Sequence, residues 1–285
     1  MESALHEIPL AVFTTLAPMG AGAFIALFIA FMSNQVDEAK LKLLDKLTVI
    51  PLLVAFAGLL ASFAHLTQPL NAINVANTIG ATPMANEITA FGVFMAAAAV
   101  YWIWALTGKM SYSMRKVFTG VLTVLAVLFA LAVGAAYLLP TIPAWNSAFT
   151  PVSILGFCLF GGSLLGLLIL QLAGCDNNAL SGVGENRLFA MLVVGFLAAL
   201  VGVVGLWVIG STATSPVVDV AANASSLLVP FVVFIILSVI VFVLGFFSVK
   251  LMPTAPVLIA ALVLLAIAVF LARLTFYGMQ IGIAL

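Results

Sequence analysis

The chain has 285 residues, of which 65% are hydrophobic and only 6% are charged, and its mean hydropathy is +1.35. A globular domain of average composition carries about 25% charged residues. This chain has too few charges to solvate its own surface, which excludes a soluble enzyme. The formal net charge is zero, so the charge balance gives no indication of nucleic-acid binding.

The hydrophobic residues fall in long continuous runs, not in alternating patterns. A helix needs roughly 20 apolar residues to cross the hydrocarbon core of a bilayer. Only helices and closed barrels satisfy their backbone hydrogen bonds there, and continuous runs indicate helices. The sequence therefore predicts an all-α integral membrane protein, a bundle of eight transmembrane helices in a single domain over residues 1–285. We place the spans at residues 10–32, 47–66, 87–107, 117–139, 151–173, 188–210, 227–249 and 255–276.

Lysine and arginine residues collect in or beside every second loop between these spans. They are Lys40, Lys42, Lys46, Lys109, Arg115, Lys116, Arg187 and Lys250. Short cytoplasmic loops are enriched in Lys and Arg, so we expect these loops in the cytoplasm and both termini on the outer face (N-out and C-out). The stretch before the first span has no Lys or Arg. Since a signal peptide begins with basic residues, we interpret it as mature sequence.

The ionisable residues outside the basic loops are expected at one depth, near the outer face. In this orientation His65 lies at the outer end of the second span, and Glu87 lies in the first turn of the third. Arg273 lies near the outer end of the eighth span, while His6 and Glu7 precede the first. Charged groups within a span are costly and indicate function. A histidine, a carboxylate and an arginine at matching depth predict a proton-handling site.

Each of these residues also has a purely structural explanation. Glu87 could complement the helix N-terminus after an Asn86 cap, and His65 could bond the last carbonyls of its helix. Arg273 could extend its side chain to the membrane interface. The remaining residues could be solvated or loop residues: His6, Glu7 and Asp219.

Two outer loops carry no charge, which is unusual for loops that face water. The second loop, residues 67–86, is long and rich in asparagine, and the fourth contains Trp145 and Phe149. Uncharged surfaces with aromatic residues are typical of protein interfaces. We therefore expect both loops to form a docking surface for another protein. The alternative is an aromatic belt at the membrane interface, which fits Trp145.

Small residues in two spans predict close contacts between helices. Gly162 and Gly166 stand four residues apart in the fifth span, and Gly202 and Gly205 lie in the sixth. Such spacing lets two helices approach closely within a bilayer. We expect these glycines to serve helix packing.

A series of short motifs runs along most of the chain in a fixed order. They are L-H-E-I-P-L (5–10), H-L-x-x-P-x-x-A-x-N (65–74), N-E-I (86–88), P-x-W (143–145), T-P (150–151), G-G-S-L-L-G (161–166) and R-x-x-F-Y (273–277). With this order and spacing in eight predicted spans, the chain resembles the membrane anchor subunit of the DMSO reductase family. Many members of that family carry an arginine near the position of Asn71, and this chain has none there.

The resemblance implies a role in anaerobic respiration at the cell inner membrane. It implies that the chain binds no metal or haem, and that it holds a molybdopterin catalytic subunit and an iron–sulfur electron-transfer subunit at the membrane. It further implies that the chain oxidises menaquinol, bound non-covalently, and passes the electrons to the iron–sulfur subunit. By similarity, His65 and Glu87 fall at the quinol site.

Quinol oxidation suits the residues expected at the outer end of the bundle. The reaction releases two electrons, which leave to a partner, and two protons, which need acceptors within hydrogen-bond reach. A neutral histidine, with a pKa near 6.5, and the Glu87 carboxylate are suitable acceptors. Arg273 could hold the carboxylate or polarise a ring oxygen. With His6 and Glu7, these residues form the expected quinol-binding set.

Other functions remain open from the residues alone. A small-molecule transporter would place polar groups and Gly or Pro breaks in mid-bilayer and would show inverted repeats, whereas the polar groups here cluster at one face. A passive anchor without quinol chemistry is a second alternative, and a b-type haem between His6 and His65 is a third. Electron transfer from an outer quinol site predicts partner subunits on the outer face. The catalytic partner, and not this chain, determines which terminal electron acceptor is reduced.

Overall fold

The structure is a computed structural model that describes residues 5–33, 36, 38–64, 77–175, 183–215, 219–250 and 254–280. These residues form the helices α2 (Ile8–Met32), α3 (Glu38–Leu47), α4 (Val49–Phe63), α5 (Pro83–Leu106), α6 (Tyr112–Ala136), α7 (Phe149–Leu172), α9 (Val183–Thr212), α10 (Val220–Lys250) and α11 (Ala255–Gly278). In this part of the sequence eight helical segments are long and apolar enough to cross a membrane, with α3 and α4 together counting as one. The predicted all-α fold with eight spans is confirmed.

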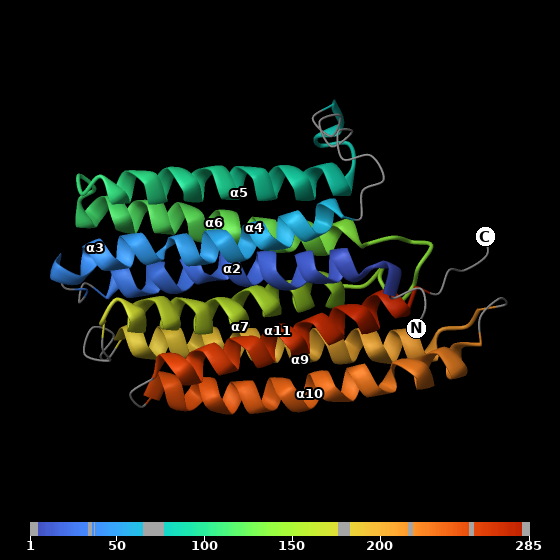
Figure 1. The fold of residues 1–285 in the computed structure, drawn as a ribbon. Helices are drawn as coiled ribbons and strands as arrows, with labels where there is room; N and C mark the ends of the chain where they lie inside the picture. The colour runs from blue at the N-terminus through green and yellow to red at the C-terminus, as the bar shows by residue number, and fades with distance from the viewer. Residues whose placement is uncertain are drawn as a thin grey trace.

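The helices run back and forth between two ends of an elongated bundle (Figure 1). We call the end where α2 begins and α11 ends the terminal end. The opposite end, where α2, α5, α7 and α10 finish, is called the basic end, because every basic residue except Arg273 lies in the helical turns or loops near it. The side of the membrane that each end faces stays a prediction.

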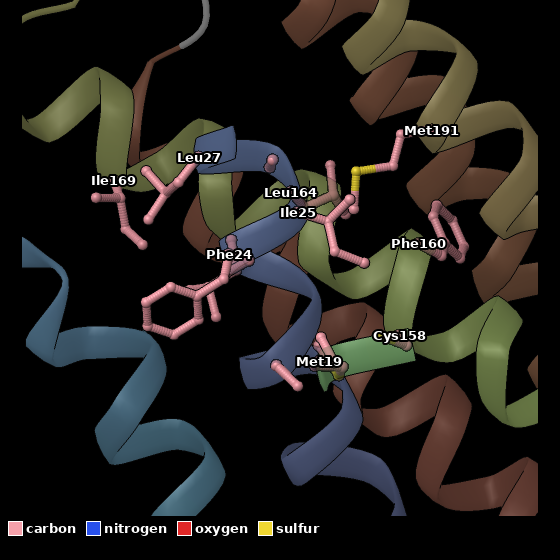
Figure 2. Close-up of a cluster of buried hydrophobic side chains, with 14 of the residues drawn as sticks. Met19, Phe24, Ile25, Leu27, Cys158, Phe160, Leu164, Ile169 and Met191 are labelled. Atoms are coloured by element: carbon pink, nitrogen blue, oxygen red, sulfur yellow. The ribbon is translucent and has the colours of Figure 1, made fainter. Parts of the chain in front are cut away.

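Helices α2 and α7 form the centre of the bundle. In their most apolar stretches 78% and 83% of the residues are buried, against 28–39% in the other six spans. Figure 1 shows α2 and α7 side by side, with the remaining helices placed outside them. Side chains of both helices belong to one buried cluster (Figure 2). Phe24 of α2 packs on Phe94 of α5, and Phe160 of α7 packs on Phe196 of α9. A helix buried on all sides needs no polar face, which explains why both are apolar throughout.

The predicted glycine contacts are confirmed at the interface of α2 and α7. A Cβ atom on Gly162 would collide with the backbone of Gly22, and one on Gly22 would collide with the carbonyl group of Cys158. Gly166 likewise faces Ala26. The glycines of α9 pack on α7, as predicted: Gly202 on Ser153 and Gly205 on Phe149. Without side chains at these points, the backbones approach closely enough for extensive van der Waals contact.

The outer helices expose large apolar side chains along their length. On α5, for example, Val100 and Ile103 are more than half exposed, and Val229 on α10 is 69% exposed. An apolar surface of this extent is stable only against lipid or another protein. The chain is therefore a multi-pass membrane protein.

The segment that contains the first three lysines differs from the prediction, because it is helical. Helix α3 buries Leu41 and Leu44 on one face and leaves lysines on the other, which is the pattern of an amphipathic helix. Asp45 on α3 is also buried, and its carboxylate forms an ion pair with Arg115 of α6, with Nε–Oδ1 and Nη2–Oδ2 distances of 3.1 and 2.5 Å. Arg115, predicted in a loop, is thus a buried helical residue.

Candidate functional site

A cavity lies between α2, α4, α5 and the end of α6 at the terminal end of the bundle. Its volume is about 190 Å³, and it is lined by Leu10, Phe13, Leu59, Ser62, Met84, Glu87, Ile88, Phe91, Ala136 and Tyr137. Its wall is apolar except at Ser62, Glu87 and Tyr137. Met84 and Ile88 are also exposed on the surface of α5, so the cavity borders the lipid-facing side of the bundle.

Helix α5 places Glu87 on the wall of this cavity. The helix begins at Pro83, and Thr82 caps it by accepting a hydrogen bond from the Ala85 backbone N–H at 3.2 Å. Glu87 therefore lies in the second turn, not in the first, and it is only 9% exposed. The prediction of an Asn86 cap is also wrong, because the Asn86 side-chain oxygen accepts a hydrogen bond from the Gly80 N–H at 2.8 Å. Capping does not explain this buried carboxylate.

Arg273 is buried near the end of α11, and its charge faces the interior of the bundle. The guanidinium donates hydrogen bonds to the Thr14 hydroxyl at 2.8 Å and to the Tyr277 hydroxyl at 3.0 Å. The rings of Tyr137, Phe276 and Tyr277 surround it, with centroids 4.1–5.1 Å from its central carbon, a favourable cation–π arrangement. The alternative that Arg273 extends to the membrane interface is therefore wrong.

Tyr137 connects the buried arginine to the cavity. It is the C-cap residue of α6, and its hydroxyl lies 2.6 Å from the hydroxyl of Tyr277. One hydrogen-bonded network thus runs from Thr14 through Arg273 and Tyr277 to Tyr137, which lines the cavity together with Glu87. Arg273 does not line the cavity, and its connection to the cavity wall runs through Tyr277 and Tyr137.

The fourth loop packs inward and closes this end of the bundle. The Trp145 indole N–H donates a hydrogen bond to the Phe276 carbonyl at 2.8 Å, and the two rings stack with centroids 4.9 Å apart. Trp145 is only 6% exposed. It belongs neither to an exposed docking surface nor to an aromatic belt, so both predictions for this residue are wrong. Of the second loop, residues 67–76 lie outside the described residues.

The other predicted site residues have varied positions. His65 lies outside the described residues, directly after Ala64, the C-cap residue of α4. His6 is exposed and Glu7 is partly buried just before α2, and neither lines the cavity. The Asp219 carboxylate accepts a hydrogen bond from the Ala222 N–H at 3.0 Å at the start of α10, which fits the expected loop role.

Within the described ranges, no group of three His, Cys, Asp or Glu side chains could hold a metal ion.

Sequence reasoning missed the two tyrosines of the network and Thr14. Tyr277 is the last residue of the R-x-x-F-Y motif, so its spacing of four from Arg273 is a signal that it shares a helical face with the arginine. Tyr137 and Thr14 follow no motif. Their contacts join residues 140 and 259 positions apart in the sequence, which no local pattern encodes.

Comparison with known proteins agrees with this architecture. Residues 1–279 match the model of the family described as DMSO reductase anchor subunit (DmsC). The sequence is 29% identical to a subunit of the anaerobic dimethyl sulfoxide reductase of Escherichia coli K12, over 100% of this protein and 99% of that one. It is 32% identical to the subunit of the same name in Haemophilus influenzae Rd, over 60% and 61% of the two proteins. It is 31% identical to YnfH, named as an anaerobic dimethyl sulfoxide reductase subunit of Escherichia coli K12, over 72% and 70%. The protein belongs to the family of DMSO reductase membrane anchor subunits.

Proposed function

We propose that this subunit oxidises menaquinol in the cavity beside Glu87 and passes the electrons to an iron–sulfur partner subunit. The observation that carries the proposal is a buried carboxylate on the wall of an otherwise apolar cavity that borders the lipid-facing surface. Menaquinol is dissolved in the bilayer, so it would enter such a cavity from the membrane. Phe13, Leu59 and Phe91 on the cavity wall offer apolar surface to its fused aromatic rings.

The proton acceptors are Glu87 and, in this proposal, His65. Oxidation breaks both O–H bonds of the quinol, so two protons leave the ring oxygens together with two electrons. Leu59 and Ser62 on α4 line the cavity, and His65 follows three residues after Ser62 in the sequence. A neutral imidazole and a carboxylate within hydrogen-bond reach of the two oxygens would accept these protons.

The proposed route of the electrons determines where the partners dock. The cavity lies at the terminal end of the bundle, and a bilayer core about 30 Å thick is too wide for one electron-transfer step. We infer that the iron–sulfur subunit and the molybdopterin catalytic subunit dock at the terminal end. Because the basic end carries nearly all the lysines and arginines, it would face the cytoplasm. The partners would then lie on the outer face of the cell inner membrane.

The experiment uses the intact complex in membrane vesicles with dimethyl sulfoxide, the acceptor for which the relatives are named. His65→Ala and Glu87→Gln should each abolish reduction driven by a menaquinol analogue. Activity with an artificial dye donor, which delivers electrons directly to the partner subunits, should remain. Glu185→Gln at the basic end is the control and should behave like the parent. Unchanged quinol turnover in both site variants would contradict the proposal and leave a passive anchor.

A further inference from the structure

The hydroxyl groups of Tyr277 and Tyr137 form a relay that begins at a permanent positive charge. The Arg273 guanidinium has only donors, so the Tyr277 oxygen is the acceptor in their 3.0 Å hydrogen bond. Arg273 is 1% exposed and Tyr277 is also 1% exposed, so water does not compete for this contact.

The direction of the first hydrogen bond favours one direction for the second. The Tyr277 oxygen already accepts from Arg273, and this leaves its own hydrogen available for the Tyr137 oxygen 2.6 Å away. When Tyr277 donates in this hydrogen bond, Tyr137 is the acceptor, and the Tyr137 hydroxyl can donate its own hydrogen to a third group. Among the described residues, the Tyr137 hydroxyl forms no other hydrogen bond. Tyr137 is one of the residues that line the cavity, which puts this donor residue beside a molecule bound there.

The charge of Arg273 strengthens every donor in this relay. A cation that donates to one hydroxyl polarises its O–H bond and makes it a better donor to the next group. Tyr137 thereby becomes a stronger donor than an isolated tyrosine, although the guanidinium stays behind the cavity wall. The arrangement resembles a preorganised donor for a developing negative charge.

We propose that Tyr137 donates a hydrogen bond to one ring oxygen of the quinone head group, and that Arg273 and Tyr277 are positioning residues that hold it as the donor. The inference rests on the proposed function. Glu87 takes the proton from this ring oxygen as its O–H bond breaks, and Tyr137 stabilises the negative charge left on the oxygen. The second ring oxygen loses its proton to the second acceptor of the proposed function. Both electrons pass to the iron–sulfur partner, both C–O bonds become C=O, and Tyr137 keeps its own proton.

The first test is Tyr137→Phe in the intact complex in membrane vesicles, with a menaquinol analogue as donor. Removing one donor to a developing oxyanion costs about 100- to 1,000-fold in rate when the donor is fully engaged, and we expect a loss of at least 10-fold in kcat/KM. Tyr101→Phe is the matched control, because Tyr101 is fully buried on α5 and its hydroxyl has no hydrogen-bond partner among the described residues. Dye-driven activity should be unchanged in both, which shows that the variants fold and assemble.

The second test separates positioning from simple structural support. Tyr277→Phe should lower quinol-driven kcat/KM in the parent but cause no further loss in a Tyr137→Phe background, because both changes interrupt one relay. Arg273→Lys, which keeps a charged donor, should retain more quinol-driven activity than Arg273→Met. Equal and additive effects of the two tyrosine changes would show independent structural roles and overturn the inference.

The outcomes also distinguish this inference from the proposed function. If Glu87→Gln abolishes quinol turnover while Tyr137→Phe matches Tyr101→Phe, the quinol site stands and the tyrosine relay is not part of it. If Glu87→Gln retains quinol turnover, the proposed site itself is wrong. Loss of quinol turnover in Glu87→Gln and Tyr137→Phe, with a non-additive Tyr277→Phe effect, supports both.

Discussion

The buried ion pair between Asp45 and Arg115 should be critical for the stability of the basic end. Asp45 is 2% exposed and Arg115 is 4% exposed, and the carboxylate accepts two hydrogen bonds from the guanidinium, at 3.1 and 2.5 Å. The third guanidinium nitrogen donates to the Met110 carbonyl. Asp45→Ala would leave a fully buried positive charge with one neutral acceptor.

The expected cost follows from the burial of both groups. Breaking a buried pair by removing one partner typically costs about 3–5 kcal/mol, because the remaining charge is desolvated and uncompensated. At about 1.4 kcal/mol per tenfold change, this corresponds to a folding equilibrium constant lower by roughly two to three and a half powers of ten. The double variant Asp45→Leu with Arg115→Met removes both charges and should recover most of the loss.

The assay is thermal unfolding of the purified subunit in detergent micelles. Unfolding is monitored by thiol labelling of Cys158 and Cys175, because both cysteines are buried in the folded state. Glu185→Ala is the matched control. Its carboxylate pairs with Lys250 at 2.8 Å, but the side chains are 26% and 33% exposed, so its loss should cost at most about 1 kcal/mol. An Asp45→Ala midpoint equal to that of Glu185→Ala, or a double variant less stable than Asp45→Ala, would refute the reasoning.

Three further predictions concern topology, packing and docking. Single cysteines at the exposed positions Ala39 and Asn146 should react with an impermeant thiol reagent from opposite sides of the membrane; labelling from one side would contradict the predicted orientation. Gly162→Leu should prevent stable folding, because its side chain would collide with the backbone of Gly22. Gly92→Leu should be tolerated, because a Cβ there meets nothing within 4 Å, and equal effects would contradict the packing. Protease added to intact spheroplasts should cleave the partner subunits; cleavage only after lysis would place them in the cytoplasm.

The eight spans could be predicted because each apolar run is long enough to cross the bilayer without help from its neighbours. Polar residues at the ends made the boundaries less certain. Thr82 and Pro83 start α5 four residues before the predicted span, and α10 begins at Val220, ahead of the predicted residue 227. The lysines of α3 are typical of a cytoplasmic loop, but Leu41 and Leu44 make the same segment an amphipathic helix, because both leucines are buried on one face.

The candidate site could be predicted only in part. The depth of a residue follows from its position along its own span, whereas its contacts depend on which helices are neighbours. Counting basic residues placed Glu87 and Arg273 at the same end of the bundle, as the structure does. Hydrogen bonds connect Arg273 through Tyr277 to Tyr137, which shares the cavity wall with Glu87. The bond between the two tyrosines joins α11 to the end of α6. That pairing depends on the lateral order of the helices, which the hydrophobic runs do not encode. The same is true of Asp45 and Arg115, which lie 70 residues apart.

Photolabelling of the intact complex with an azido-quinone tests the central claim, that the cavity beside Glu87 binds the quinol, most directly. After illumination and digestion, labelled peptides should come from the cavity wall, from α4 near Leu59 and from α5 between Glu87 and Phe91. Excess menaquinone should suppress this labelling, and Glu87→Gln should weaken it. Specific, competable labelling confined to α9 or α10, with the cavity peptides unmodified, would contradict the account.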